Sequence, residues 1–112
     1  MQIKRSPKYN SNLFKILDYI AKDKISASEN FLKELDKLIN NLPNFPFKFR
    51  QSVYFDNKNI RDMVYKGYTV IYRVNESENI IDIVRIFHKN KPPLKNQRNN
   101  KYEETNNFFL NL

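Results

Sequence analysis

One histidine stands in the string Arg85-Ile86-Phe87-His88-Lys89, and it is the residue best suited to acid–base chemistry in this sequence. A neutral imidazole near physiological pH can accept a proton from a ribose 2′-hydroxyl or donate one to a leaving oxygen. Arg85 and Lys89 could then stabilise the negative charge that develops on a phosphate. The alternative, which the residue type alone favours, is a histidine at a strand end that hydrogen-bonds a turn.

Three arginines fall on three successive predicted strands, at Arg61, Arg73 and Arg85. Together they could form a basic stripe across one face of a sheet that binds nucleic acid or another target. Arginine suits phosphate because its planar fork makes two parallel hydrogen bonds. The alternative is a structural ion pair between Arg73 or Arg85 and Asp62 or Asp82.

The basic charge is concentrated near the C-terminus. The chain has a formal net charge of +8, and residues 85–101 contain no Asp or Glu. A biased composition favours lysine over arginine, but it does not produce an acid-free stretch. We therefore expect a polyanion or an acidic protein as partner, contacted in part by Lys91, Lys95 and Arg98.

Several kinds of chemistry are excluded by composition. The chain has one glycine, so it holds no glycine-rich phosphate loop, and it has no cysteine for thiol catalysis, disulfides or zinc. One histidine cannot build a His-rich metal site, so we predict neither a metal nor a cofactor. No segment approaches the roughly 18 apolar residues of a membrane span, and no signal peptide is visible. We expect a cytoplasmic protein that does not enter a membrane.

Two amphipathic helices are predicted in the first half of the chain, after a short edge strand over residues 1–6 that stops at Pro7. Ser26 and Glu29 have the spacing of a capping box at the start of the second helix. Pro43 marks the end of that helix. Apolar residues follow helical spacing in both segments, at Leu13, Ile16, Leu17 and Ile20 and then at Phe31, Leu35, Leu38, Ile39 and Leu42.

Short β-prone segments fill the second half, at residues 51–55, 60–65, 68–74 and 80–87. Lys66-Gly67 fits a tight hairpin turn that needs a positive φ. Strands joined by such short turns pair antiparallel. The tyrosines of these strands could stack on bases, but a tyrosine-rich sheet more often fills a core, and we favour the core.

These elements predict an α+β fold of one domain over residues 1–93: an N-terminal strand, a helical hairpin and an antiparallel β-meander, in two layers. Residues 94–112 form a basic, polar tail that we expect to be disordered or loosely attached. The tail ends in Phe108-Phe109-Leu110, which could dock on the domain or on a partner.

The order of elements and several strings resemble the RelE/ParE superfamily of type II toxins, over residues 1 to about 93. Each string alone is weak, and their order and spacing together carry the resemblance. The strings are Ser6-Pro7-Lys8, Leu42-Pro43-Asn44-Phe45-Pro46, Ile60-Arg61-Asp62, Tyr65-Lys66-Gly67-Tyr68-Thr69-Val70-Ile71-Tyr72-Arg73-Val74 and Val84-Arg85-Ile86-Phe87-His88-Lys89.

The resemblance implies a toxin that arrests bacterial growth by one of two activities. ParE-like members poison DNA gyrase, whereas RelE-like members are ribosome-dependent endonucleases that cut messenger RNA without a metal. In the nucleases an arginine commonly follows the tyrosine that opens the third meander strand, but here Thr69 follows Tyr68. A histidine near the end of the last strand occurs in both branches, so His88 does not decide. The long helical hairpin and the Tyr-Arg-Val strand favour the ParE-like branch.

The resemblance also implies a cognate antitoxin with an acidic, amphipathic segment that wraps the toxin. A toxin–antitoxin hetero-oligomer or a homodimer is expected. In the nuclease alternative, His88 is the acid–base catalyst, with Arg85 or Lys89 as phosphate stabiliser. A second alternative is a small basic nucleic-acid-binding module.

Overall fold

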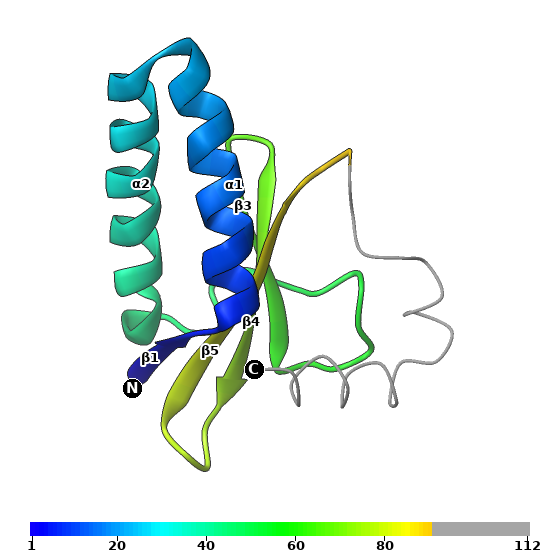
Figure 1. Cartoon of the computed structure of the whole chain (residues 1–112). Helices are drawn as coiled ribbons and strands as arrows, with labels where there is room; N and C mark the ends of the chain where they lie inside the picture. The colour runs from blue at the N-terminus through cyan, green and yellow to red at the C-terminus, as the bar shows by residue number, and fades with distance from the viewer. Residues whose placement is uncertain (91–112) are drawn as a thin grey trace.

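The protein folds as two helices packed against a sheet of five strands (Figure 1). The computed structural model describes residues 1–90. In chain order the elements are β1 (Gln2–Arg5), α1 (Pro7–Asp23), α2 (Ile25–Asn40), the 3-10 helix η1 (Leu42–Asn44), β2 (Arg50–Gln51), β3 (Ile60–Tyr65), β4 (Tyr68–Asn75) and β5 (Ile80–His88). The strand order across the sheet is β1-β5-β4-β3-β2. The predicted α+β class, helical hairpin and meander are confirmed.

The sheet is mixed, because β1 runs parallel to β5 while the other pairs are antiparallel. Gln2 lies opposite Ile80 and Arg5 lies opposite Ile83. Nearly the whole domain separates these two strands in sequence, so no short turn forces them to run antiparallel. The predicted edge strand at the N-terminus is confirmed.

Helix α1 begins at Pro7, earlier than the apolar stripe from Leu13 indicates. Ser6 is its N-cap: the Ser6 Oγ accepts a hydrogen bond from the Tyr9 amide at 2.9 Å and donates one to the Val84 carbonyl at 2.7 Å. Pro7 suits the first turn, since its fixed φ is helical and its missing N–H is not needed there. The cap therefore also fixes the start of α1 on β5.

The predicted capping box at Ser26 and Glu29 is wrong. Helix α2 already begins at Ile25, and its N-cap is Lys24, whose side chain makes no capping hydrogen bond. Lys24 is the one extended residue between the two helices, so Ser26 falls inside the first turn. The Ser28 Oγ instead donates to the Leu17 carbonyl at 2.8 Å. Contact between the helices, and not a local cap, sets the start of α2.

The β3–β4 hairpin closes through Lys66-Gly67, as predicted. Tyr65 lies opposite Tyr68, which leaves a two-residue turn. Lys66 has a φ of 48° and Gly67 a φ of 83°. Two successive positive φ values define the turn whose twist matches that of the flanking strands.

The predicted strand over residues 51–55 is wrong beyond Gln51. Strand β2 contains only Arg50 and Gln51, and the chain then leaves the edge of the sheet. The Val53 amide donates to a side chain, the Asp62 carboxylate, at 3.0 Å, where a longer strand would need a backbone partner. Phe55 is buried beneath this segment. Packing of Phe55 thus overrides the β-propensity of residues 52–55.

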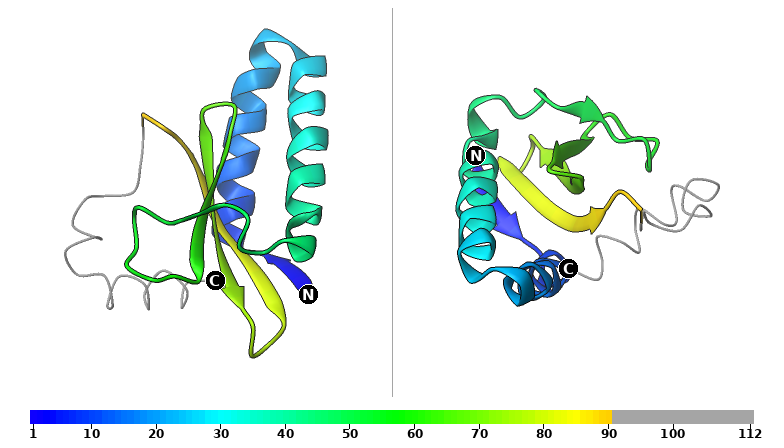
Figure 2. Two further views of the ribbon diagram at one scale, coloured as in Figure 1. Left: turned by 180° about the vertical axis from the view of Figure 1, so that it is seen from behind. Right: turned by 90° about the horizontal axis from the view of Figure 1, so that it is seen from above.

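Two apolar cores lie on opposite faces of the sheet. Helices α1 and α2 cover one face and bury the larger core, which includes Tyr9, Leu35, Tyr72 and Ile83. Residues 52–59 cross the other face, opposite the helices (Figure 2). The second core beneath them consists of Phe55, Ile60, Ile71, Val84 and Phe87, with Tyr54 packed against it. The two predicted layers are therefore joined by a loop that covers part of the far face.

Candidate functional site

The end of β5 is held against the β3–β4 turn. The Lys89 amide donates to the Gly67 carbonyl at 2.9 Å. The half-buried His88 ring meets the Tyr68 ring edge-on, with 5.1 Å between centroids. The Asn90 amide donates to His88 Nδ1 at 3.2 Å. These contacts fix His88 at the rim of the sheet, beside the turn.

The hydrogen bond from Asn90 restricts the acid–base chemistry of His88. A ring nitrogen that accepts an N–H carries no proton, so the neutral imidazole keeps its proton on Nε2. In this tautomer neither nitrogen is available to take a proton from a hydroxyl group. The geometry thus resembles a strand-end histidine that hydrogen-bonds a turn more closely than a general base.

A groove of about 660 Å³ runs between α1 and the end of β5, and His88 forms part of its wall. Two tyrosines, the exposed Tyr19 and the half-buried Tyr68, also line it. Burial raises the pKa of Tyr68, and the nearby Tyr19 hydroxyl raises it further. The other lining residues are Asn12, Lys15, Ile16, Arg85, Ile86, Phe87 and Asn90. The groove combines aromatic and basic side chains and contains no carboxylate among the described residues.

Sequence reasoning missed the α1 wall of this groove. Asn12, Lys15, Ile16 and Tyr19 have the spacing i, i+3, i+4 and i+7, which places them on one helical face. That spacing is visible in the sequence as part of the amphipathic pattern. Which element this face meets depends on the position of β5.

The predicted basic stripe does not form, because the three arginines do not share a face. Arg61 lies opposite Tyr72, a residue of the helix-side core, and cross-strand pairs point to the same face. Arg73 and Arg85 lie opposite residues of the second core. Arg61 therefore projects from the opposite face of the sheet.

Arg61 supports the chain after α2. Its Nε donates to the Lys58 carbonyl at 2.9 Å, and its Nη1 donates to the Phe49 carbonyl at 3.1 Å. Its guanidinium group also lies 4.9 Å from the centre of the Phe47 ring. Burial lowers the pKa of Arg85. The three arginines are half-buried and lie on opposite faces of the sheet, so they do not form one phosphate-binding surface together.

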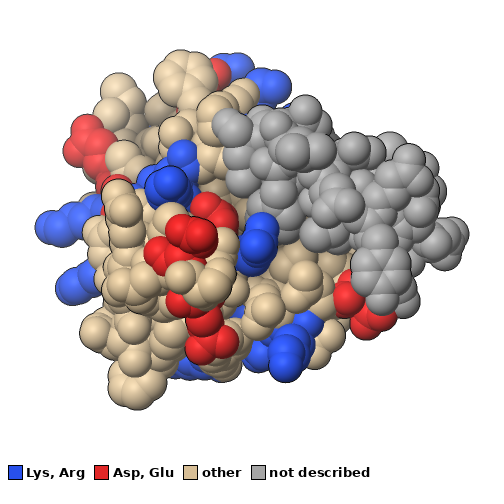
Figure 3. Space-filling model, turned by 90° about the horizontal axis from the view of Figure 1, so that it is seen from below, with Lys and Arg blue, Asp and Glu red and all other residues tan. Residues whose placement is uncertain are grey.

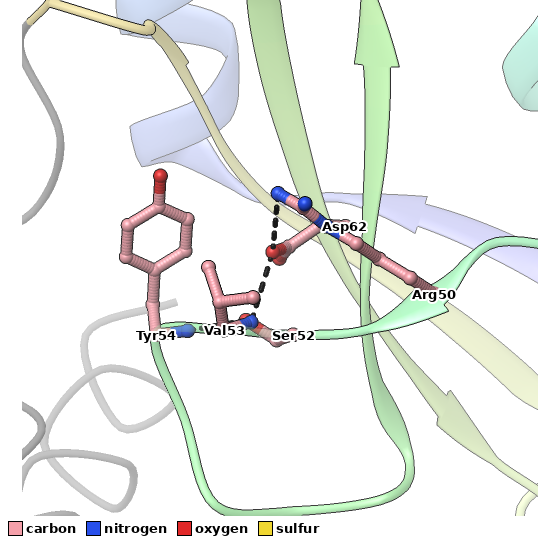
Figure 4. A network of polar contacts seen from close by, with 5 residues as sticks. All are labelled: Arg50, Ser52, Val53, Tyr54 and Asp62. Atoms are coloured by element: carbon pink, nitrogen blue, oxygen red, sulfur yellow. Dashed lines mark hydrogen bonds and ion pairs between the residues drawn. The ribbon is translucent and has the colours of Figure 1, made fainter.

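Asp62 is fully buried and pairs with a residue that the sequence did not indicate (Figure 4). Arg50 Nη2 lies 3.5 Å from Asp62 Oδ2, and the same oxygen accepts the hydrogen bond from the Val53 amide. The suggested partners Arg73 and Arg85 project from the same face as Asp62. Arg73 lies directly opposite Asp82 across β4 and β5, in agreement with the structural alternative for that pair.

Basic charge does not form an unbroken patch on the face seen from below. There, Asp and Glu side chains gather in a group with Lys and Arg around it (Figure 3). The predicted contacts Lys91, Lys95 and Arg98, and the tail over residues 94–112, lie outside the described residues.

A second groove, of about 750 Å³, lies along the C-terminal half of α2. At its border the Tyr65 hydroxyl donates to the Glu34 carboxylate, and Lys66 Nζ lies 3.1 Å from the same oxygen. The hydrogen bonds from Tyr65 and Lys66 lower the pKa of Glu34. Leu38 and Phe45 are exposed at or beside this end of α2. This surface therefore has exposed apolar side chains next to the hydrogen-bonded group of Glu34, Tyr65 and Lys66.

Within residues 1–90, no three His, Cys, Asp or Glu side chains come close enough to hold a metal ion. None of the helices there is long and apolar enough to cross a membrane.

Residues 3–93 match the sequence model of the ParE toxin of the type II toxin–antitoxin system parDE. The chain belongs to the ParE toxin family. A solved structure described as the chromosomal ParDE toxin–antitoxin system from P. aeruginosa has the same fold, with a TM-score of 0.63 and 16% sequence identity. That match covers 79% of this chain and 95% of the other. A comparison with curated proteins finds no match.

As a ParE-like toxin, the protein is one half of a type II toxin–antitoxin pair, and an antitoxin is its implied partner. The family match spans both helices and all five strands, and the predicted resemblance to the RelE/ParE superfamily is confirmed. The ParE-like branch, which the helical hairpin and β4 favoured, is the one that matches.

Proposed function

We propose that this toxin arrests bacterial growth by poisoning DNA gyrase, and that it acts in the cytoplasm without chemistry of its own. The match of residues 3–93 to the ParE toxin family carries the proposal. Two features of the fold support it over messenger cleavage. His88 Nδ1 is occupied by the Asn90 amide. Thr69, at the position where the nucleases carry an arginine, is buried and lies opposite Phe87.

We further propose that the cognate antitoxin covers the groove along α2. An acidic, amphipathic segment would find exposed apolar side chains at Leu38 and Phe45 and cationic ones at Lys37 and Lys48. Burial of such apolar groups drives most protein association, while opposite charges guide the encounter. The two grooves share no lining residue, so binding there would leave the groove at the end of β5 open.

The gyrase proposal is tested by tightly controlled induction in a bacterial host, with chromosome breaks and messenger-RNA ends followed together. Breaks with intact messengers are the expected result. In a purified system, gyrase and supercoiled plasmid should yield linear DNA when the toxin is added. His88→Ala should leave both readouts largely intact, because the proposal assigns no proton transfer to His88.

Cut messengers with an unbroken chromosome would overturn the proposal in favour of the ribosome-dependent nuclease, with His88 as catalyst and Arg85 or Lys89 beside it. Continued growth in the presence of folded protein would instead contradict the toxin activity itself. In that case, salt-sensitive binding to nucleic acid would indicate a small basic binding module.

A further inference from the structure

The groove between α1 and the end of β5 has the composition of a nucleobase site. An aromatic side chain at 72% exposure, Tyr19, stands on its helical wall, and the Tyr68–His88 pair stands on its sheet wall. Bases stack on aromatic faces whatever their sequence, since each base presents a π-face. The two walls therefore offer aromatic surface from both sides of one groove.

The same groove contains a hydrogen-bond acceptor that lacks a partner. Asn12 lines the groove, and its Oδ1 is buried and accepts no hydrogen bond. A buried acceptor without a donor is energetically unfavourable, so a donor supplied by a ligand would be stabilising. The exocyclic amino group of a base is a donor of the kind that asparagine recognises.

The charge of the groove fits a polyanion. Lys15 lies one helical turn from Tyr19 on the same face, and Lys89 follows His88 directly. Among the described residues that form its walls, none is acidic. A cation beside a stacking platform is the arrangement by which proteins hold the backbone of an unpaired strand.

We propose that this groove binds a single-stranded segment of nucleic acid, with a base on Tyr19 and Tyr68 and a backbone phosphate on Lys15. The site includes Arg85 of the basic stripe that the sequence predicted, but neither Arg61 nor Arg73 lines it, and it needs no bond cleavage. It does not depend on gyrase as the target. In the context of the proposed function, it would let the toxin hold an unpaired strand at its target.

The test uses the full chain and fluorescent oligodeoxycytidine and oligocytidine of about twelve nucleotides, with a duplex of the same length as competitor. Binding is followed by anisotropy over a range of salt concentrations. The oligonucleotides are expected to bind and the duplex to compete poorly, because a paired base cannot enter the groove. Tighter binding of the deoxy or the ribo strand identifies DNA or RNA as the ligand.

Two substitutions have matched controls in this chain. Tyr19→Ala should weaken binding about tenfold, the loss expected for one stacked base. Phe14→Ala should not, although Phe14 is 71% exposed on the same helix, because it does not line the groove. Lys15→Ala should reduce the slope of log K against log salt by about 0.7, whereas the exposed Lys33→Ala should leave it unchanged.

Equal losses in Tyr19→Ala and Phe14→Ala, or a duplex that competes as well as a single strand, would overturn the inference. Because gyrase is absent from this assay, its outcome is independent of the proposed target. If the toxin breaks chromosomes but does not bind the oligonucleotides, single-strand binding in this groove is refuted and the proposed function still stands.

Discussion

At the scale of single residues, the partner of a charged side chain depends on the strand register. From sequence position alone, Arg73 and Arg85 are the candidate partners of Asp62. In the fold its carboxylate binds the Val53 amide and Arg50, and so it anchors the segment that covers the second core. Its other oxygen, Oδ1, is buried and makes no hydrogen bond.

Asp62→Asn is expected to lower the free energy of unfolding by about 1–3 kcal/mol, because the loss of charge weakens two contacts inside a buried site. Urea denaturation would measure this loss. Asp18→Asn is the matched control, since Asp18 is 61% exposed and only pairs with Lys22 on the helix surface. The control should change stability by less than about 0.5 kcal/mol. Equal effects in the two variants would contradict the anchoring role of Asp62.

At the scale of elements, the β3–β4 turn joins three parts of the molecule. Gly67 permits the turn through its positive φ and accepts a hydrogen bond from Lys89 after β5. Lys66 contacts Glu34 on α2. A small change in this turn should therefore affect both the hairpin and the end of β5.

Gly67→Ala is expected to cost about 1–2 kcal/mol of stability, because an L-residue with a side chain is strained at a φ of 83°. Space is not the cause, since the added Cβ would lie 3.8 Å from His88 Nε2, an ordinary contact. Gly67→Asn should lose less, because asparagine tolerates positive φ. Thermal and urea unfolding of both variants would show the order, and a greater loss in the asparagine variant would refute backbone strain as the cause.

At the scale of the whole molecule, two fully buried tyrosines hold the helix layer and the sheet together. Tyr9 lies on α1, and Tyr72 on β4 donates from its hydroxyl to the Pro46 carbonyl at 2.7 Å. Burial raises the pKa of Tyr9 to about 12, with Asp36 adding to the effect. Burial likewise raises the pKa of Tyr72 to about 12.

These shifts predict a loss of stability in alkaline solution. In the unfolded chain the tyrosines ionise near the ordinary tyrosine pKa of 10.0, and in the folded protein near 12. The unfolded state therefore releases its tyrosine protons at lower pH than the folded state. The contribution of the two neutral tyrosines to the free energy of unfolding is fully present below pH 10 and is lost as the pH rises towards 12. Urea unfolding between about pH 8 and 12 would measure the slope, and Tyr72→Phe should make it shallower. A variant slope as steep as that of the wild type would exclude Tyr72 as a source.

The sequence by itself determined the features that arise from local chemistry. Helical spacing, the Lys66-Gly67 turn and the alternation of the strands depend on neighbours a few residues away, and each appears in the fold. The tertiary structure decided the rest, because it depends on residues distant in sequence. Phe55 packs in the second core, so residues 52–55 leave the edge of the sheet. Helix α2 begins at Ile25 because the two helices contact each other there. The strand register separated Arg61 from Arg73 and Arg85. The packing of α1 against β5 brought Tyr19 into one groove with Tyr68 and His88.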